Sequence, residues 1–342
     1  MKKIIFTAAC LCLFISANAQ PKSSYKIANK IKVEGDGGWD YLLADELADR
    51  LYISHGTMVQ IIDTKKNELI GTIPDTKGVH GITLAHDLNK GFISNGKDTS
   101  VTVFDIKTLK TITKVKISSI NPDAILYDKF SQKVFIYNGR SKNATVIDAK
   151  TDKVVETIPL EGKPEFSVTD LAGKIYVNIE DKNLLTVINA TTLKVEQNWP
   201  ITGGEEPTGL ALDNKTHRLF TVCGNKVMVV MDALNGKIIA TLPIGDGCDG
   251  VAFDTELKRA YSSNGEGTIT VVQEENETNF KVIETVQTQK GARTITVNSK
   301  THHVYLSVGE YDEAPAPTVE NPRARPKVKS GSFVILDVEL IK

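Results

Sequence analysis

Cysteine is scarce in this sequence. Four cysteines occur in 342 residues, and two of them, Cys10 and Cys12, lie in an N-terminal segment that we expect to be removed. A disulfide framework therefore cannot hold the fold together. The remaining pair, Cys223 and Cys248, could form one bond in an oxidising compartment or stay as two buried thiols, and the sequence leaves both outcomes open.

The sequence also lacks an excess of charge of either sign. Lysine and arginine number 41 and aspartate and glutamate 42, for a net charge of -1. The protein has no overall electrostatic field that would favour nucleic acid or an anionic membrane surface. After the N-terminus no stretch approaches the ~20 apolar residues of a membrane helix. We expect a monomer with no membrane span, and nucleic acid is not an expected partner.

The N-terminal segment has the features of an export signal. "MKKIIFTAACLCLFISANAQ" combines two lysines, a short apolar run and small residues, so we predict a cleavable signal peptide over residues 1–19. A lipoprotein would need Cys10 or Cys12 as its new N-terminus, and the apolar run before Cys10 is very short. We therefore expect a periplasmic or secreted protein whose residues 20–342 form a single domain.

An internal repeat dominates the rest of the chain. Seven short segments each open with an aromatic residue and recur every 40 to 44 residues, in the range of four-stranded propeller blades. The aromatic residues are Tyr52, Phe92, Phe135, Tyr176, Phe220, Tyr261 and Tyr305. Each unit divides into four runs rich in Val, Ile, Thr and aromatics, bounded by Gly, Asn, Asp or Lys, which predicts four short strands.

The third predicted strand of a unit usually ends on an acid or an amide. Such a side chain can accept a hydrogen bond from the backbone two residues on and tighten the turn, so we assign these residues a structural role. They are Asp63, Asp105, Asp148, Asn189, Asp232 and Asp337.

The seventh unit has no fourth strand of its own. "YKIANKIKVEGDGG", residues 25–38, matches the fourth-strand segments of other units. This N-terminal strand can complete the last blade and close the ring, which removes exposed sheet edges. We predict an all-β, seven-bladed β-propeller with four antiparallel strands per blade.

The repeat pattern of "FIYNGRSKNATVIDAKTDKVVETI" resembles the YVTN-repeat family, including the YncE-like exported propellers. The resemblance covers nearly all of residues 20–342 and implies the propeller fold. Function does not follow from it, because these repeat residues build blades and a fold does not determine a chemistry.

Strand direction places the candidate functional residues on one face. If the first strand of each blade descends along the central channel, the links from strand two to strand three and from each blade to the next share the top face. One predicted ring of residues enters the first strands: Asp40, His80, Asp123, Thr208, Asp249 and Arg293. Glu165 is the best match from the fourth blade, where a turn shorter by one residue makes the alignment ambiguous. A second predicted ring ends the second strands: His55, Asn95, Asn138, Asn178, Cys223 and Asn264.

The segment "YISHG" carries a histidine, His55, where "FISNG" and "YSSNG" carry asparagine. We predict that His55 converges with Asp40 and His80 on one sector of the rim. Histidine with carboxylate suits a divalent metal or a general base oriented by an acid. The alternative is a histidine that bonds only to its own surroundings. The other histidines are predicted to be solvated turn residues on the bottom face: His86, His217, His302 and His303.

A long proline- and charge-rich segment, residues 309–332, replaces a short turn in the seventh blade. It is too long for an idle connector, and its prolines favour extended conformations. A similar insertion is found in YncE-like proteins. We predict a lid over the channel mouth, with an acidic start and a basic end of Arg323, Arg325, Lys327 and Lys329. Four basic residues beside an acidic rim do not favour nucleic acid, although some YncE-like proteins are associated with DNA.

Two functions compete at this rim. No P-loop, serine nucleophile elbow or zinc-helix motif is present, which favours a protein that binds a small ligand, glycan or protein partner. The predicted ligand-binding set is Trp39, Asp40, His55, His80, Asp123, Asn138, Glu165, Asn178, Asp249 and Arg293.

The alternative is a metal-assisted hydrolase or lyase. The rim is similar in residue types to streptogramin-type lyases and some lactonases, which hold a divalent cation at the channel mouth. In this reading Asp40, His80 and Asp123 are the metal ligands, His55 and His80 are acid–base candidates, and Arg293 steadies an oxyanion. The sequence does not decide whether the protein is an enzyme.

Overall fold

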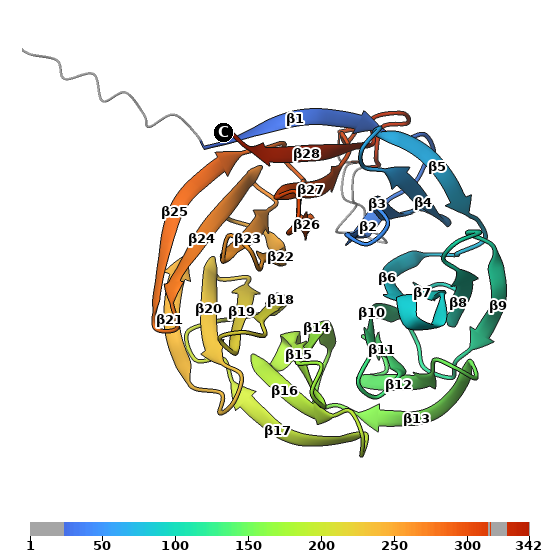
Figure 1. Ribbon diagram of the computed structural model, residues 1–342, viewed down its shortest axis with the longest axis horizontal. Coiled ribbons are helices and arrows are strands. Elements are labelled where there is room, and N and C mark those ends of the chain that lie inside the picture. Colours follow the sequence, from blue (N-terminus) through green and yellow to red (C-terminus); the bar gives the residue numbers. More distant parts are fainter. Residues whose placement is uncertain (1–23, 314, 316–326, 342) are drawn as a thin grey trace, which may run out of the picture.

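The computed structural model describes residues 24–313, 315 and 327–341. They form a ring of seven four-stranded antiparallel sheets around a central channel (Figure 1). The predicted propeller, its blade number and its strand number per blade are confirmed. The predicted signal peptide lies outside the described residues. Within the described part, no helix has the length and apolarity of a membrane span.

Blades 1 to 4 follow the chain from the inner to the outer strand. They are β2 (Trp39–Asp45), β3 (Arg50–His55), β4 (Met58–Asp63) and β5 (Glu68–Ile73); β6 (Val79–Ala85), β7 (Lys90–Asn95), β8 (Ser100–Asp105) and β9 (Thr111–Lys116); β10 (Pro122–Asp128), β11 (Lys133–Asn138), β12 (Asn143–Asp148) and β13 (Lys153–Pro159); and β14 (Pro164–Thr169), β15 (Lys174–Ile179), β16 (Leu184–Asn189) and β17 (Lys194–Pro200).

Blades 5 to 7 complete the ring. They are β18 (Pro207–Asp213), β19 (Arg218–Cys223), β20 (Val227–Asp232) and β21 (Ile238–Pro243); β22 (Cys248–Asp254), β23 (Arg259–Asn264), β24 (Thr268–Asn276) and β25 (Asn279–Gln287); and β26 (Thr294–Asn298), β27 (His303–Val308), β28 (Val334–Leu340) and β1 (Tyr25–Lys32). Two single-turn 3-10 helices, η1 (His86–Leu88) and η2 (Glu180–Lys182), lie in connections.

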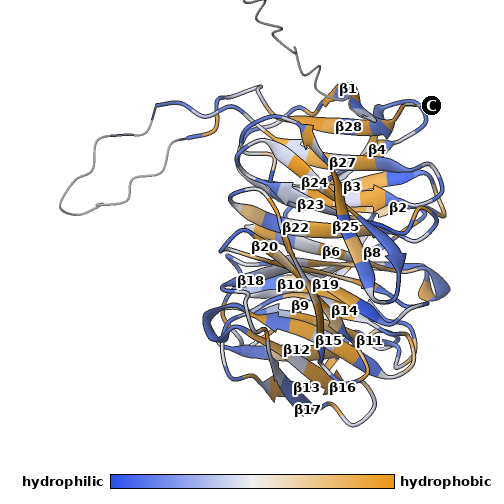
Figure 2. Cartoon of the chain, turned by 90° about the vertical axis from the view of Figure 1, so that its left-hand side faces the viewer, coloured by the Kyte–Doolittle hydropathy of each residue, from blue (hydrophilic) through white to orange (hydrophobic). Residues whose placement is uncertain are grey.

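The core lies between the blades. The second and third strands are buried on both faces, as in β3 and β12, because each blade stacks against two neighbours. The outer strands are largely exposed, as in β13. Figure 2 accordingly shows apolar strands inside the blades and polar loops at their ends. At the end of β12, Asp148 accepts hydrogen bonds from the backbone of Lys150 and Thr151, the predicted structural role.

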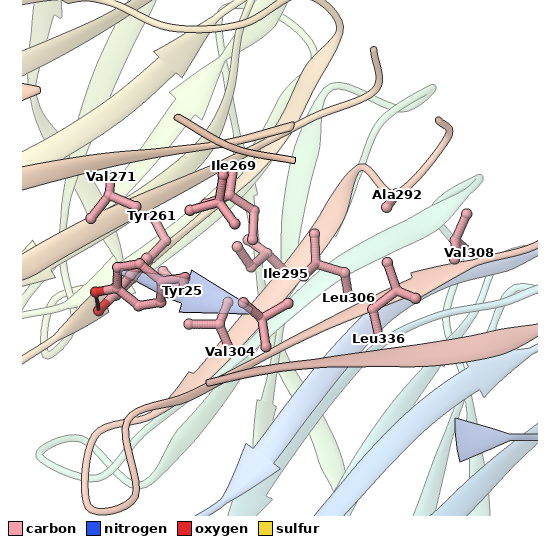
Figure 3. Packing of buried hydrophobic residues seen from close by; sticks show 13 residues of the cluster. Tyr25, Tyr261, Ile269, Val271, Ala292, Ile295, Val304, Leu306, Val308 and Leu336 are labelled. Carbon is pink, nitrogen blue, oxygen red and sulfur yellow. Dashed lines mark hydrogen bonds between the residues drawn. The ribbon is translucent and has the colours of Figure 1, made fainter. Parts of the chain in front are cut away.

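The N-terminal strand closes the ring as predicted. β1 pairs antiparallel with β28, from Tyr25 opposite Leu340 to Lys32 opposite Val334. The Tyr25 and Tyr261 hydroxyls lie 3.0 Å apart inside the cluster between blades 6 and 7 (Figure 3). Because β1 brings an aromatic anchor into the core as well as a row of backbone hydrogen bonds, closure joins the two ends of the domain.

Both cysteines are buried free thiols. The Cys248 sulfur donates to the Cys223 carbonyl oxygen at 3.0 Å, so the two residues are neighbours without a disulfide. Burial raises the pKa of each thiol to about 12. The structure therefore selects the thiol alternative, and no disulfide contributes to closing the ring among the described residues.

The histidines of the bottom face correct the sequence prediction. His217 is exposed as expected. Three others bond to buried carboxylates and are not simply solvated turn residues: His86 to Asp45 (3.0 Å), His302 to Asp254 (2.8 Å) and His303 to Asp337 (2.6 Å). Two of these pairs join neighbouring blades, which the pattern of turns could not reveal.

Candidate functional site

A bulge in the inner strands aims the candidate residues into the channel. In blade 1, Trp39 pairs with His55 and Leu42 with Ile53, so two residues of β2 oppose one of β3. Such a bulge turns a side chain out of the sheet. Five other blades have the same irregularity, and the residues it carries are Asp40, His80, Asp123, Glu165, Thr208 and Asp249. Glu165, whose alignment was ambiguous in sequence, is therefore the ring member of blade 4.

The second strands hold these bulges in place from the neighbouring blade. The Ser94 hydroxyl donates to the carbonyl oxygen of Asp123, and the Ser263 hydroxyl to that of Arg293. Asn178 takes the equivalent position in blade 4, where its amide donates to the Thr208 carbonyl oxygen at 2.9 Å. The backbone of one ring residue is thus fixed by the preceding blade.

The second predicted ring does not reach the channel mouth. Asn178 is fully buried by the contact just described, and Asn138 is fully buried with its amide 3.0 Å from the Thr145 hydroxyl of its own blade. The predicted rim placement of both residues is wrong. These two asparagines hydrogen-bond to buried groups, Asn138 within its own blade and Asn178 in the next blade.

His55, like these asparagines, lies in the interior and not at the channel mouth. It is fully buried, stacks on Phe333 at 4.3 Å between ring centroids, and places Nδ1 2.8 Å from the Gln60 amide oxygen. Gln60 donates its amide to the Glu34 carbonyl oxygen at 2.7 Å, so Nδ1 of His55 donates the proton. Histidine replaces asparagine because its partner is a glutamine. The predicted convergence of His55 with Asp40 and His80 is wrong.

The other three predicted metal ligands do converge. His80 Nδ1 lies 2.6 Å from Asp40 Oδ2 and 3.7 Å from Asp123 Oδ1, and one donor atom from each residue falls within 4.8 Å of the others. The three residues come from three consecutive blades. The imidazole lies against Gly96, where a Cβ would be 2.6 Å from Nε2. A glycine at the end of β7 thus makes room for the histidine.

Charges around this cluster are only partly balanced. Burial lowers the pKa of His80, but the Asp40 hydrogen bond and the charge of Asp123 outweigh it and raise the value above 6.5. Burial, reinforced by Asp40 and opposed by His80, raises the pKa of Asp123 to about 6. The protonation of Asp123 therefore depends on the charge of the neighbouring His80.

The far side of the ring has two cationic partners. Lys163 lies 2.6 Å from Glu165, and Arg293 lies 3.3 Å from Asp249. Burial nevertheless raises the pKa of Glu165 to about 7 against the opposing Lys163. Burial, together with Asp40 and Asp123, raises the pKa of Asp249 to about 6 against Arg293. Lys163, Arg293 and these raised pKa values thus partly offset the repulsion between the ring carboxylates.

Sequence reasoning missed Tyr41, which lies directly below the ring. Its ring contacts Phe166 of blade 4 at 4.6 Å between centroids, across the channel. Burial raises the pKa of Tyr41 well above 10, and four ring carboxylates add to the effect. The residues at this level in the other blades are small: Gly81, Ala124, Gly209, Gly250 and Thr294. The sequence signal for this pair was two aromatic residues at a position where the other five blades have small residues. The two aromatic rings lie below the ring of polar residues at the mouth.

A cavity of about 730 Å³ opens from the cluster over the top of blades 1 to 3. Its lining includes Trp39, Asp40 and His80 at the inner end and Lys97 and Arg140 farther out. The lining residues all belong to links between strands two and three or between blades, or to the start of an inner strand. This confirms that these links share one face.

The base of the predicted lid lies on the same face. Tyr311 bridges to Val328 in an antiparallel ladder, and Tyr311 packs against Trp39 at 5.7 Å between ring centroids. Ser330 donates to Asp36 at 2.6 Å. Residues 314 and 316–326, which include Arg323 and Arg325, lie outside the described residues, so the cover over the mouth stays a prediction.

Comparison with known proteins supports the fold only. A chain of Kuenenia stuttgartiensis hydrazine synthase matches with a TM-score of 0.69 and 15% sequence identity, covering 80% of this chain and 94% of that one. Similar chains of solved structures number 1805, so the architecture is too common to indicate a function. No protein-family model and no curated protein matches. The YVTN-repeat and YncE-like resemblance stays a prediction.

Proposed function

We propose that the protein binds a small ligand at the channel mouth, where a cationic group of the ligand contacts the acidic residues. The observation that carries this proposal is the convergence of Asp40, His80 and Asp123 from three blades, with Asp40 and His80 lining the inner end of a cavity of about 730 Å³. A cavity of this size suits a small molecule or the end of a glycan or peptide better than a broad protein interface.

The electrostatics favour a cation over a neutral ligand. The ring carboxylates Asp40, Asp123, Glu165 and Asp249 have Arg293, Lys163 and the titratable imidazole of His80 as cationic partners. The carboxylates therefore outnumber the cations even when His80 is protonated. Partly buried carboxylates in this situation retain protons that a bound cation can displace. Tyr41 below them stays neutral and closes the site from beneath.

Calorimetric titration with a series of primary alkylamines and quaternary ammonium ions tests the proposal. We expect saturable binding to the wild-type protein and roughly tenfold or greater loss in Asp40→Asn and Asp123→Asn, since each removes one charge from the contact. Asp246→Asn, an exposed carboxylate with 56% side-chain exposure, is the matched control and should bind normally. Absence of binding to every cation would overturn the proposal.

A divalent metal ion is the second candidate, because the same three side chains offer one nitrogen and two oxygen donors within 4.8 Å. Imidazole and carboxylate are ligands that catalytic zinc and related ions accept. Binding would have to open the 2.6 Å His80–Asp40 hydrogen bond, since two ligands of one ion lie farther apart. A metal-assisted hydrolase or lyase would then use Arg293 beside the site, whereas buried His55 cannot serve as its base.

Metal analysis of protein purified without chelator separates the two candidates. A stoichiometric divalent ion that disappears in His80→Ala supports the metal centre. Organic cations that bind equally well with and without chelator support the first proposal. We further propose, from the sequence, an exported YncE-like protein, which N-terminal sequencing of the mature chain tests through the expected cut after Ala19.

A further inference from the structure

The cavity at the channel mouth has opposite charges at its two ends. Blade 1 contributes Asp36 and Asp40, and His80 follows from blade 2. The outer end is lined by Lys97, in the turn between β7 and β8, and by Arg140, in the turn between β11 and β12. A molecule that fills the whole cavity therefore meets carboxylates at one end and cations at the other.

The two outer cations have no partner in the fold. Lys97 and Arg140 are exposed, and neither side chain forms a hydrogen bond or ion pair with another described residue. Two lysines near this face do have carboxylate partners: Lys114 bonds to Asp75 at 2.7 Å, and Lys163 to Glu165 at 2.6 Å. The outer pair thus keeps its full capacity for an anionic group.

Arg293 is a poorer partner for such a group. It faces Asp249 at 3.3 Å and does not line this cavity. Arg140 presents a planar donor fork that matches a carboxylate, and Lys97 adds a second charge from the neighbouring blade. The cavity thus offers a carboxylate at Asp40 and a guanidinium donor fork at Arg140.

We infer that the ligand is a zwitterion, with an ammonium group at Asp40, at the inner end of the cavity, and a carboxylate between Lys97 and Arg140. This inference rests on the proposed cation-binding function and names its ligand class: an amino acid, or a larger molecule that carries both charges. The distance between the two ends of the cavity then selects the separation of the two groups.

Calorimetry with unbranched ω-amino acids, from glycine to 6-aminohexanoate, measures that selection. Each compound is compared with the alkylamine that lacks its carboxylate. We expect one chain length at which the amino acid binds about tenfold more tightly than its amine, the gain typical of a charge-assisted contact. Amines that bind while no amino acid binds better would refute the inference and leave the proposed function standing. Failure of both sets would refute the proposed function itself.

Variants assign the preference to the outer end. The double variant Lys97→Ala with Arg140→Ala should lose the tenfold preference and keep the affinity for the amine within about twofold, because Asp40 and Asp123 are untouched. Lys107→Ala with Lys110→Ala, two exposed lysines between β8 and β9, removes equal charge from the opposite face and should keep the preference. A preference that survives in the first variant would contradict the assignment.

Discussion

Replacing Asp249 tests whether the buried, ionised carboxylates of the ring destabilise the protein, because removing its charge should then raise stability. Its side chain is 22% exposed, and burial raises its pKa from 3.8 to about 6 even with Arg293 nearby. A carboxyl with a raised folded pKa costs stability only where it is ionised. That cost is absent below about pH 4, grows through the interval between the two pKa values, and is complete above about pH 7.

The size of the effect follows from the two pKa values. A rise in pKa of about two units corresponds to on the order of 2–3 kcal/mol, which for a domain of this length is a rise in Tm of roughly 3–5 °C. Asp249→Asn should therefore melt several degrees above wild type at pH 8 and at the same temperature at pH 4. Arg293, which is 52% exposed, stays solvated after the change and adds little cost.

Differential scanning calorimetry at pH 4, 6 and 8 measures the difference, with Asp246→Asn as the control. That carboxylate is 56% exposed beside Lys226, so its replacement should change Tm little at any of these pH values. Equal shifts of Asp249→Asn at pH 4 and pH 8, or a loss of stability at pH 8, would refute the electrostatic account of the ring.

Three further outcomes are expected. Cation affinity should rise between about pH 5 and pH 8 and then level off. Asp123 and Glu165 have pKa values of about 6 and about 7, and both bind a cation best when ionised. A cation affinity that does not change with pH would contradict this. Tyr25→Ala should lower stability by about 3 kcal/mol in chemical unfolding, because it empties a buried aromatic site at the ring closure, and an unchanged midpoint would count against closure by β1. Cys223 and Cys248 should resist a thiol reagent in the folded protein and give two thiols in denaturant, because burial raises both pKa values to about 12; fewer than two would indicate a disulfide.

Much of the fold could be predicted because its signals are local and repeated. Seven aromatics at even spacing set the number of blades, and the match of residues 25–38 to fourth-strand segments predicted the partnership of β1 with β28. Alternating strand direction then placed Asp40 and His80 at one opening. Each of these inferences needs only the order of strands along the chain.

The side chains around the mouth were predicted less evenly. Asp40, His80 and Asp123 converge as expected, because the bulge that carries them recurs at the same repeat position. His55 and Asn138 were misplaced, because strict alternation along a strand does not show that the end of the second strand turns into the blade stack. Whether such a residue faces water or a neighbouring sheet depends on the partner it meets there.

The sequence by itself determined the propeller, its closure and the face on which polar residues gather, because backbone pairing in a repeat follows from periodic patterns of apolar and turn residues. Only the tertiary structure decided which polar residues meet. His55 hydrogen-bonds to Gln60 in the interior, and Tyr41 packs against Phe166 across the channel. The Lys97 side chain forms no hydrogen bond or ion pair with another described residue. Such contacts join different strands or blades, and their energies depend on distance and burial that no single strand encodes.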